Sequence, residues 1–250
     1  MDDKIKNKSL AKAFSILECF LDNRYLGITE LSKILGLSKS SIHDAVSTLE
    51  ALGYMSKDTS TGKYYLGINC VRIGRAAMSN YEFKDIASNH IREISNQVGE
   101  TCYLTIPHGF SVYFLDVAVP EESRIFTPAL PNSTDAMSCT GGGKCMLAAS
   151  SDEFIQDCIA NGLPQMTENT ITDPEKFWDE IRLIRERGYA VDDMEYSIGI
   201  RCVARPIISL DGSLLGSISI SGPSPRMTDE KILEYSELLK RHIYELVHSI

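Results

Sequence analysis

Residues 28–67, ITELSKILGLSKSSIHDAVSTLEALGYMSKDTSTGKYYLG, have the pattern of a helix-turn-helix followed by a β wing. Apolar residues recur at helical spacing between Ile28 and Leu35, and Gly36 breaks that first helix. Ser38 carries a hydroxyl suited to cap the start of a second helix. We expect the second helix to turn an apolar face inward, formed by Ile42, Ala45, Val46, Leu49 and Leu52.

The opposite face of the second predicted helix carries short or hydrogen-bonding side chains. A helix of this kind can enter the major groove and reach base edges and phosphates. Residues 58–62 form a turn of the type that hairpins use, which predicts a wing with a cation and a phenol near its tip. A helical protein-interaction module is the alternative interpretation. We predict contact with double-stranded operator DNA through Ser38, Lys39, Ser40, Ser41, His43, Ser47, Lys63 and Tyr64.

The segments before and after this stretch extend the first domain. Residues 9–21 carry an apolar stripe at helical spacing, which would complete a three-helix core. Residues 68–81 have similar spacing, which predicts a linking helix and not a flexible tether. We therefore place a winged helix-turn-helix domain at residues 1–67, a linker helix at 68–81 and a second domain at 82–250.

The second domain contains helical and strand-like segments. Helical spacing predicts helices at residues 83–98, 144–149, 152–160, 174–188 and from 228 to the C-terminus. Strands are predicted at 101–106, 111–117, 203–208 and 214–221, the last two joined by the hairpin signal Asp211-Gly212. Residues 120–138 are expected to be irregular. Helices flanking an antiparallel set of strands make the predicted fold class α+β.

Length and charge are consistent with two domains of different character. The chain has 250 residues, 43% of them hydrophobic, which is enough for two folded cores. Residues 1–75 hold 11 Lys+Arg against 8 Asp+Glu, whereas residues 76–250 hold 14 against 26. The basic surplus therefore falls on the predicted DNA-binding half. The sequence shows no membrane-length apolar run and no signal peptide, so we expect a cytoplasmic protein without membrane contact.

Three glycines, residues 141–143, lie directly before a predicted helix. Unpaired amides at a helix N-terminus bind anions, and glycine lets a ligand approach the backbone closely. The spacing of a phosphate-binding loop is absent, so a small carboxylate fits better than a phosphate. The alternative is a tight loop before a packed helix.

Ser219 and Ser221 leave the same face of one predicted strand, because side chains alternate along a strand. If that face lines a cavity, the two hydroxyls would bind a polar ligand. If the face meets water, they would be ordinary surface serines. The alternation by itself leaves both possibilities open.

The order of these motifs resembles the IclR-type bacterial transcriptional regulators. The resemblance covers nearly the whole chain and rests on the wing sequence TGKYYLG, the glycine-rich TGGGK, RERGYAVDDMEYSIGIRCVARPI and SISISGPSPRMT. It implies a winged helix that binds operator DNA, and a GAF-like C-terminal domain that takes small organic acids or sugar acids. It also implies a homodimer or homotetramer that represses or activates transcription and is not an enzyme.

The resemblance further implies an effector site. The carboxylate of the effector would meet the amides of Gly141 and Gly142. The other contacts would come from the polar residues Asp192, Cys202, Ser219 and Ser221 and from the apolar residues Met137 and Ile200. Two positions depart from the family pattern: Ser138 stands where a histidine is usual, and Asp44 stands where a basic residue is common. Asp44 would either change the base preference or point sideways to pair with a neighbour.

Cysteine chemistry supplies two rival hypotheses. The seven cysteines form no C-x-x-C pair and the five histidines are isolated, so we expect reduced thiols, no metal site and no cofactor. Cys145 lies near a predicted helix N-terminus, and Cys202 lies in the predicted pocket. The rivals are a regulator that senses oxidants through these thiols and a cysteine-dependent enzyme built on the GAF-like domain.

Overall fold

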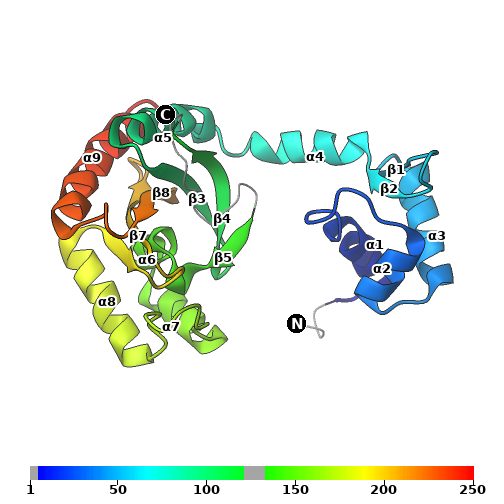
Figure 1. Ribbon diagram of the computed structural model, residues 1–250, viewed down its shortest axis with the longest axis horizontal. Coiled ribbons are helices and arrows are strands. Elements are labelled where there is room, and N and C mark those ends of the chain that lie inside the picture. Colours follow the sequence, from blue (N-terminus) through cyan, green and yellow to red (C-terminus); the bar gives the residue numbers. More distant parts are fainter. Residues whose placement is uncertain (1–4, 121–132) are drawn as a thin grey trace. The chain divides into compact units, whose positions relative to one another are not determined.

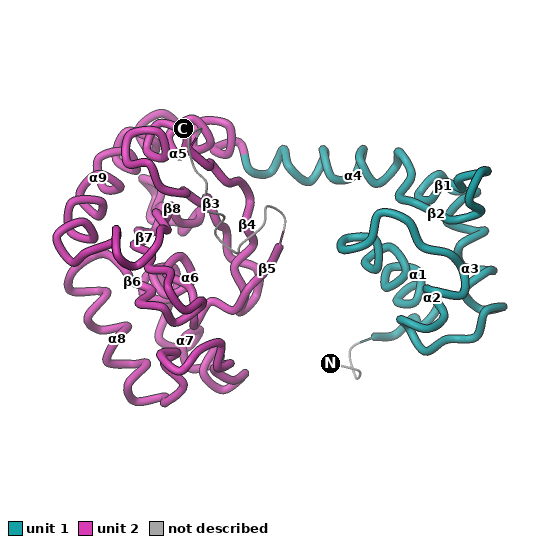
Figure 2. Tube along the Cα trace, in the orientation of Figure 1, with its two compact units in different colours: residues 1–81 teal, residues 82–250 magenta. Residues whose placement is uncertain are grey.

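The computed structural model describes residues 5–120 and 133–250 and divides into two compact units, residues 1–81 and 82–250 (Figure 2). Residues 121–132, which belong to the segment expected to be irregular, lie outside the described residues. The remainder of that segment forms a short strand, β5 (Thr134–Ala136), and part of a 3₁₀ helix (Met137–Cys139).

The first unit is a winged helix-turn-helix. Its elements in chain order are α1 (Lys8–Glu18), α2 (Ile28–Leu35), α3 (Lys39–Ala51), β1 (Met55–Lys57), β2 (Tyr64–Leu66) and α4 (Ile68–Met78). Gly36 ends α2 in the left-handed conformation with φ of 65°, and the Ser38 hydroxyl accepts the backbone N–H of Ser41 at the start of α3. These two residues confirm the predicted turn. Gly36 lets the chain leave α2, and Ser38 pairs a backbone N–H at the start of α3 that would otherwise have no partner within the helix.

The core of the first unit forms where α1, α2 and α3 meet the wing. Ile16, Leu31, Ile42 and Val46 have no exposed surface. Leu52, expected on the inward face of α3, is instead exposed, because α3 ends at Ala51 and Leu52 occupies its C-cap. The predicted linking helix is α4, whose Asn69 side chain donates to the backbone carbonyl of Leu52.

The second unit contains a six-stranded antiparallel sheet. Its strands are β3 (Thr101–His108), β4 (Ser111–Ala118), β5, β6 (Ala190–Asp193), β7 (Ile200–Ile208) and β8 (Leu214–Pro223), in the spatial order β5-β4-β3-β8-β7-β6. Its helices are α5 (Phe83–Val98), α6 (Gly141–Ala148), α7 (Asp152–Asn161), α8 (Pro174–Arg187) and α9 (Asp229–Val247). Sequence periodicity missed β5 and β6, which are three and four residues long and too short to show alternation.

Helices cover both faces of this sheet (Figure 1). Helices α5 and α9 pack on one face, and α6 packs on the other with α7 and α8 against it. Phe177 and Ile181 of α8 and Met146 of α6 are fully buried in the core on the α6 side. The predicted α+β class is therefore confirmed, and the strand residues that face α6 become the walls of any cavity beside that helix. Within residues 5–120 and 133–250, no helix combines the length and apolar character needed to cross a membrane.

Candidate functional sites

A small cavity of about 40 Å³ lies between the first turn of α6 and the face of the sheet that α6 covers. Seven of the eight predicted effector residues line it: Gly141, Gly142, Asp192, Ile200, Cys202, Ser219 and Ser221. Sequence reasoning missed the remaining lining residues, which are Tyr103, Thr105, Val112, Phe114, Thr140 and Tyr196. Apart from Tyr196, these residues lie on β3 and β4 or at the N-cap of α6.

Strand register explains why the lining residues meet. Asp192 pairs with Cys202, and Cys202 pairs with Ser221, so one row of the sheet carries a carboxyl, a thiol and a hydroxyl side by side. Ser219 lies in the next row, opposite Tyr103 of β3. Directly opposed residues in a sheet project to the same face, so both rows point toward α6. The alternation of serines in β8 therefore reflects a cavity wall and not a wet surface.

The glycines begin α6 and are not a loop before it. The Thr140 hydroxyl accepts the N–H of Gly143 at 3.1 Å. The amides of Gly141 and Gly142 are the first two of the helix, and such amides have no partner within their own helix. A Cβ atom at Gly142 would lie 2.8 Å from Ser217 Oγ and 2.9 Å from Thr105 Oγ1. Glycine is therefore required for the close approach of α6 to the sheet, and it leaves two amides at the cavity wall.

Met137 is the one predicted effector residue that the structure places elsewhere. Its side chain is fully buried in the core on the α6 side, and it is not part of the cavity wall. Its backbone lies against Gly143, where a Cβ atom would come within 2.2 Å of the Met137 carbonyl oxygen. Met137 thus supports the glycine turn from behind. Ser138, next to it, is also buried.

Asp192 holds the loop that forms one side of the cavity. Its Oδ1 accepts the backbone N–H groups of Glu195 at 2.7 Å and of Tyr196 at 3.2 Å. Burial raises the pKa of Asp192 to about 7, although the charge of Lys144 opposes the shift. This rise favours the protonated carboxyl, which can donate a hydrogen bond to a ligand oxygen.

A buried ion pair joins the same loop to α6. The Lys144 side chain is 1% exposed, donates to Glu195 Oε1 and lies 3.6 Å from Glu180 Oε1. Burial raises the pKa of Glu195, and the Lys144 ammonium opposes that rise. The Tyr196 hydroxyl donates to Asp135 Oδ2 at 2.9 Å, which ties the loop to β5. The loop is thus anchored on both sides of the cavity.

The thiols of Cys145 and Cys202 are buried. Burial raises the pKa of Cys145 to about 12, and Cys145 Sγ lies 3.1 Å from the Gly142 carbonyl oxygen that it donates to. Burial also raises the pKa of Cys202, and the nearby Asp192 charge adds to the effect. Both groups stay protonated near pH 7, whereas an oxidant sensor or a nucleophile needs the thiolate. Burial of these two thiols weighs against both thiol hypotheses.

The candidate DNA-binding surface is the outer face of α3. Lys39, Ser40 and His43 are exposed there, and Ser47 is half-buried. Ser38 and Ser41 have structural partners: Ser38 caps the helix, and the Ser41 hydroxyl accepts from Lys12 Nζ at 2.8 Å. Asp44 lies at the edge of a groove between α1 and α3, with its side chain 84% exposed and its carboxylate 4.0 Å from His43 Nδ1.

The wing corrects one predicted DNA contact. The Tyr64 side chain is buried in the core of the first unit, because it lies opposite Leu26 and pairs with it through the backbone. Tyr65, the next residue, faces outward and packs edge-on against Tyr25 at 5.8 Å between ring centroids. Lys63 is partly exposed, but its Nζ forms an ion pair with Glu30 at 2.8 Å. The phenol on the outer side of the wing is thus Tyr65.

A winged helix-turn-helix followed by a second unit built on an antiparallel sheet defines the class of two-domain DNA-binding regulators. Residues 75–245 match the model of the bacterial transcriptional regulator IclR C-terminal domain, and residues 9–59 match the IclR helix-turn-helix domain. The chain belongs to the IclR family of transcriptional regulators. It is a DNA-binding regulator and not an enzyme.

Named relatives and solved structures agree with this assignment. The chain is 32% identical to the HTH-type transcriptional regulator BhcR of Paracoccus denitrificans, over 96% of this chain and 86% of that one. The IclR structure from Thermotoga maritima is 31% identical with a TM-score of 0.77, covering 96% and 98% of the two chains. An IclR homolog from Microbacterium hydrocarbonoxydans, complexed with 4-hydroxybenzoate, has a TM-score of 0.86 at 19% identity, covering 97% and 100%.

Proposed function

We propose that a small organic acid, either a simple carboxylate or a sugar acid, binds in the cavity of the second unit and controls operator binding by the first. The observation that carries the proposal is the pair of helix-start amides, from Gly141 and Gly142, at the wall of a cavity with polar sides. Such amides bind a carboxylate, because their N–H groups and the helix dipole both favour negative charge.

The rest of the wall suits the other end of such a ligand. Ser219, Ser221 and Cys202 offer hydroxyl and thiol groups for a keto or hydroxyl oxygen, and Asp192 accepts or donates according to its protonation. The aromatic rings of Tyr103 and Phe114 supply apolar contact. An IclR homolog was solved in complex with 4-hydroxybenzoate, which is a small carboxylate. The ligand would act by favouring one of two states that differ in DNA affinity.

A thermal-shift screen against glyoxylate, pyruvate, sugar acids and hydroxybenzoates tests this proposal. A ligand at about 100 times its dissociation constant adds roughly 2.7 kcal/mol of stability, which is a readily measured shift in Tm. Gly142→Val is expected to abolish the shift and keep operator binding, because its side chain would press against Ser217 and Thr105 and displace the start of α6 from the cavity wall. Gly74→Ala is the control, since a Cβ atom there meets nothing within 4 Å. A shift that survives in Gly142→Val would place the ligand elsewhere.

We further propose that operator DNA lies against α3 and the wing, with Lys39 on a phosphate and Ser40 and His43 toward base edges. Ser38, Ser41, Ser47, Lys63 and the exposed Tyr65 lie on or beside this surface. A helix-turn-helix of this kind reads two half-sites as a dimer, so we expect a homodimer or a homotetramer.

Lys39→Ala should weaken binding to all DNA sequences alike and lower the slope of log K against log salt by about 1, as the loss of one phosphate contact does. Fluorescence anisotropy with operator and scrambled duplexes at several salt concentrations measures both effects. Lys176→Ala, an exposed lysine of the second unit, should leave both unchanged. A change in base preference without a change in salt slope would contradict the phosphate role.

A further inference from the structure

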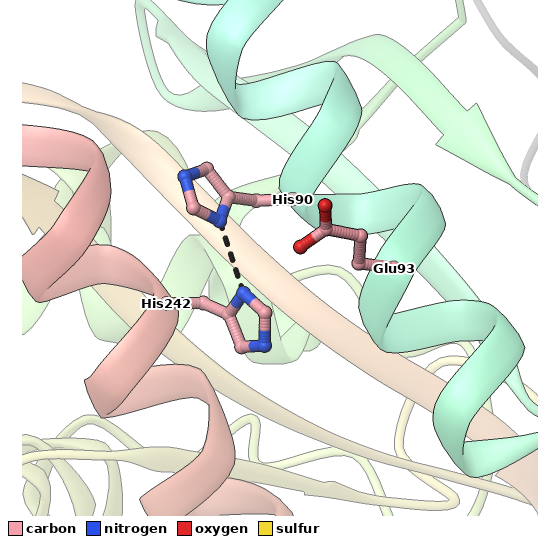
Figure 3. A group of neighbouring side chains, drawn as sticks. All are labelled: His90, Glu93 and His242. Atoms are coloured by element: carbon pink, nitrogen blue, oxygen red, sulfur yellow. Dashed lines mark hydrogen bonds between the residues drawn. The ribbon is translucent and has the colours of Figure 1, made fainter. Parts of the chain in front are cut away.

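Three side chains with metal-binding atoms meet where α5 lies against α9, on the sheet face opposite the effector cavity (Figure 3). His90 and Glu93 belong to α5, and His242 belongs to α9. One ligand atom from each of the three residues lies within 4.8 Å of the other two. The two histidines are separated by 152 positions in the sequence, so only the fold brings them together.

The spacing of the two imidazoles is close to that of ligands on one metal ion. His90 Nδ1 and His242 Nδ1 lie 3.0 Å apart, and the two rings are nearly perpendicular at 80°. Two nitrogens bound tetrahedrally to zinc, each about 2.0–2.1 Å from the metal, lie about 3.3 Å apart. The Nδ1–Nδ1 distance is therefore within a few tenths of an ångström of that between two ligands of one zinc ion, and rotation of the rings would aim both lone pairs at the ion.

Each histidine can also present an unprotonated Nδ1, which is the form that binds a metal ion. A hydrogen bond between two Nδ1 atoms needs one of them to accept, so one lone pair already points at the partner ring. The other ring exposes its own Nδ1 lone pair when its proton moves from Nδ1 to Nε2, with no change in net charge. A cation can then occupy the position between the two nitrogens.

Glu93 supplies the third ligand and a negative charge. It lies three residues after His90, a spacing that places both side chains on the same side of a helix. Figure 3 shows its carboxylate directed toward the His90 ring from the next turn of α5. Glu93 is exposed and both histidines are half-buried, so an ion can enter from solvent. The charges that act on His242 include the carboxylates of Glu245 and Glu93 and the guanidinium of Arg241.

We propose that His90, Glu93 and His242 bind one divalent transition-metal ion of the zinc class, which clamps α5 to α9. Two imidazoles and one carboxylate form a nitrogen and oxygen donor set that suits Zn²⁺ and also accepts Co²⁺ and Ni²⁺. Water would complete the coordination. Because α5 begins at Phe83, directly after the first unit, the ion would stiffen the helix with which the second unit starts.

Titration of the full-length protein with Co²⁺, after chelator treatment and dialysis, tests the proposal. We expect visible absorption bands that saturate at one ion per chain, without the near-ultraviolet band of a cobalt–thiolate bond. Zn²⁺ should compete with Co²⁺ and raise the Tm of the stripped protein. A thiolate band would assign the ion to the cysteines, of which Cys19 and Cys70 are half-buried, and would overturn the proposal.

Single substitutions identify the ligands. His242→Gln and Glu93→Gln should each weaken Co²⁺ and Zn²⁺ binding by at least about tenfold, because removal of a direct ligand costs no less than removal of its supporting partner. His248→Gln is the matched control, a histidine at the end of the same helix and outside the cluster. The Tm measured in the presence of a chelator shows whether each variant is folded. If His242→Gln does not fold, Glu93→Gln still tests the site, because Glu93 is exposed. Unchanged affinity in the folded ligand variants, or no saturable binding by the wild-type chain, would overturn the proposal.

Discussion

Lys144→Met is expected to lower the free energy of unfolding of the second unit by about 3–5 kcal/mol at pH 8. Lys144 is almost fully buried between Glu195 and Glu180, and its removal leaves the Glu195 carboxylate buried without a cation. Breaking a buried ion pair from one side is costly, because the remaining charge keeps its desolvation penalty and loses its partner.

The loss from Lys144→Met should depend on pH. Burial already raises the folded-state pKa of Glu195, and Lys144 holds that rise back, so the substitution raises the pKa further. A carboxyl with a raised folded-state pKa disfavours folding increasingly as the pH climbs from its unfolded value, about 4.3, through the folded value. The variant should therefore be much closer to the wild type at pH 5 than at pH 8.

Urea unfolding followed by tryptophan fluorescence measures this effect. The chain has a single tryptophan, Trp178 in α8, so the signal reports on the second unit. The double variant Lys144→Met, Glu195→Gln should recover most of the lost stability, because the more deeply buried carboxylate is neutralised and Glu180 keeps its ion pair with Arg187 at 2.9 Å. Lys176→Met, an exposed lysine of the same helix as Trp178, is the matched control. A loss of equal size at both pH values, or no recovery in the double variant, would contradict the ion-pair explanation.

Gly143→Ala should cost about 3 kcal/mol or more and disturb the effector cavity. A Cβ atom at this position would lie 2.2 Å from the Met137 carbonyl oxygen and 2.4 Å from Met137 Cα. These are backbone atoms, so they cannot rotate away, and the 3₁₀ helix that leads into α6 would have to move. Steric conflict with a backbone is among the few mechanisms that make a single methyl group so costly.

Gly141→Ala, two residues earlier, is the matched control for Gly143→Ala. Its Cβ atom would contact only side chains, the nearest being Cys202 Sγ at 3.1 Å. We expect this variant to unfold within about 1 kcal/mol of the wild type under the same fluorescence assay. Comparable losses in the two variants would show that the helix start adapts more freely than its contacts indicate.

Several features of this protein follow from local chemistry and could be predicted from the sequence. Gly36 and Ser38 define the turn between α2 and α3, because a left-handed C-cap and a hydroxyl N-cap act within a few residues. The alternation in β8 places Ser219 and Ser221 on one face whatever covers that face. Three glycines before a helical segment already indicated close backbone contact, and the family resemblance directed attention to the cavity.

Other features depend on contacts between distant segments, and local patterns cannot supply them. Tyr64 and Tyr65 have the same side chain, so only the bridge to Leu26 decides which ring enters the core. Met137 had the apolar character of a cavity wall, yet the backbone of its turn supports Gly143 while its side chain enters the core. For Tyr64 the deciding neighbour is Leu26, and for Met137 it is the core on the α6 side, which distant segments build.

What the sequence determined by itself is most of the elements, the family and seven of the thirteen cavity residues, since capping, periodicity and motif spacing are local properties of the chain. What only the tertiary structure decided is which charged and polar groups lose water and meet each other. A lysine after three glycines would ordinarily be solvated, but α6 packs between the sheet and α8 and forces Lys144 to pair with Glu195 and Glu180. The meeting of His90 with His242 has the same origin, because α5 and α9 lie at opposite ends of the second unit's sequence and become neighbours only on the folded sheet.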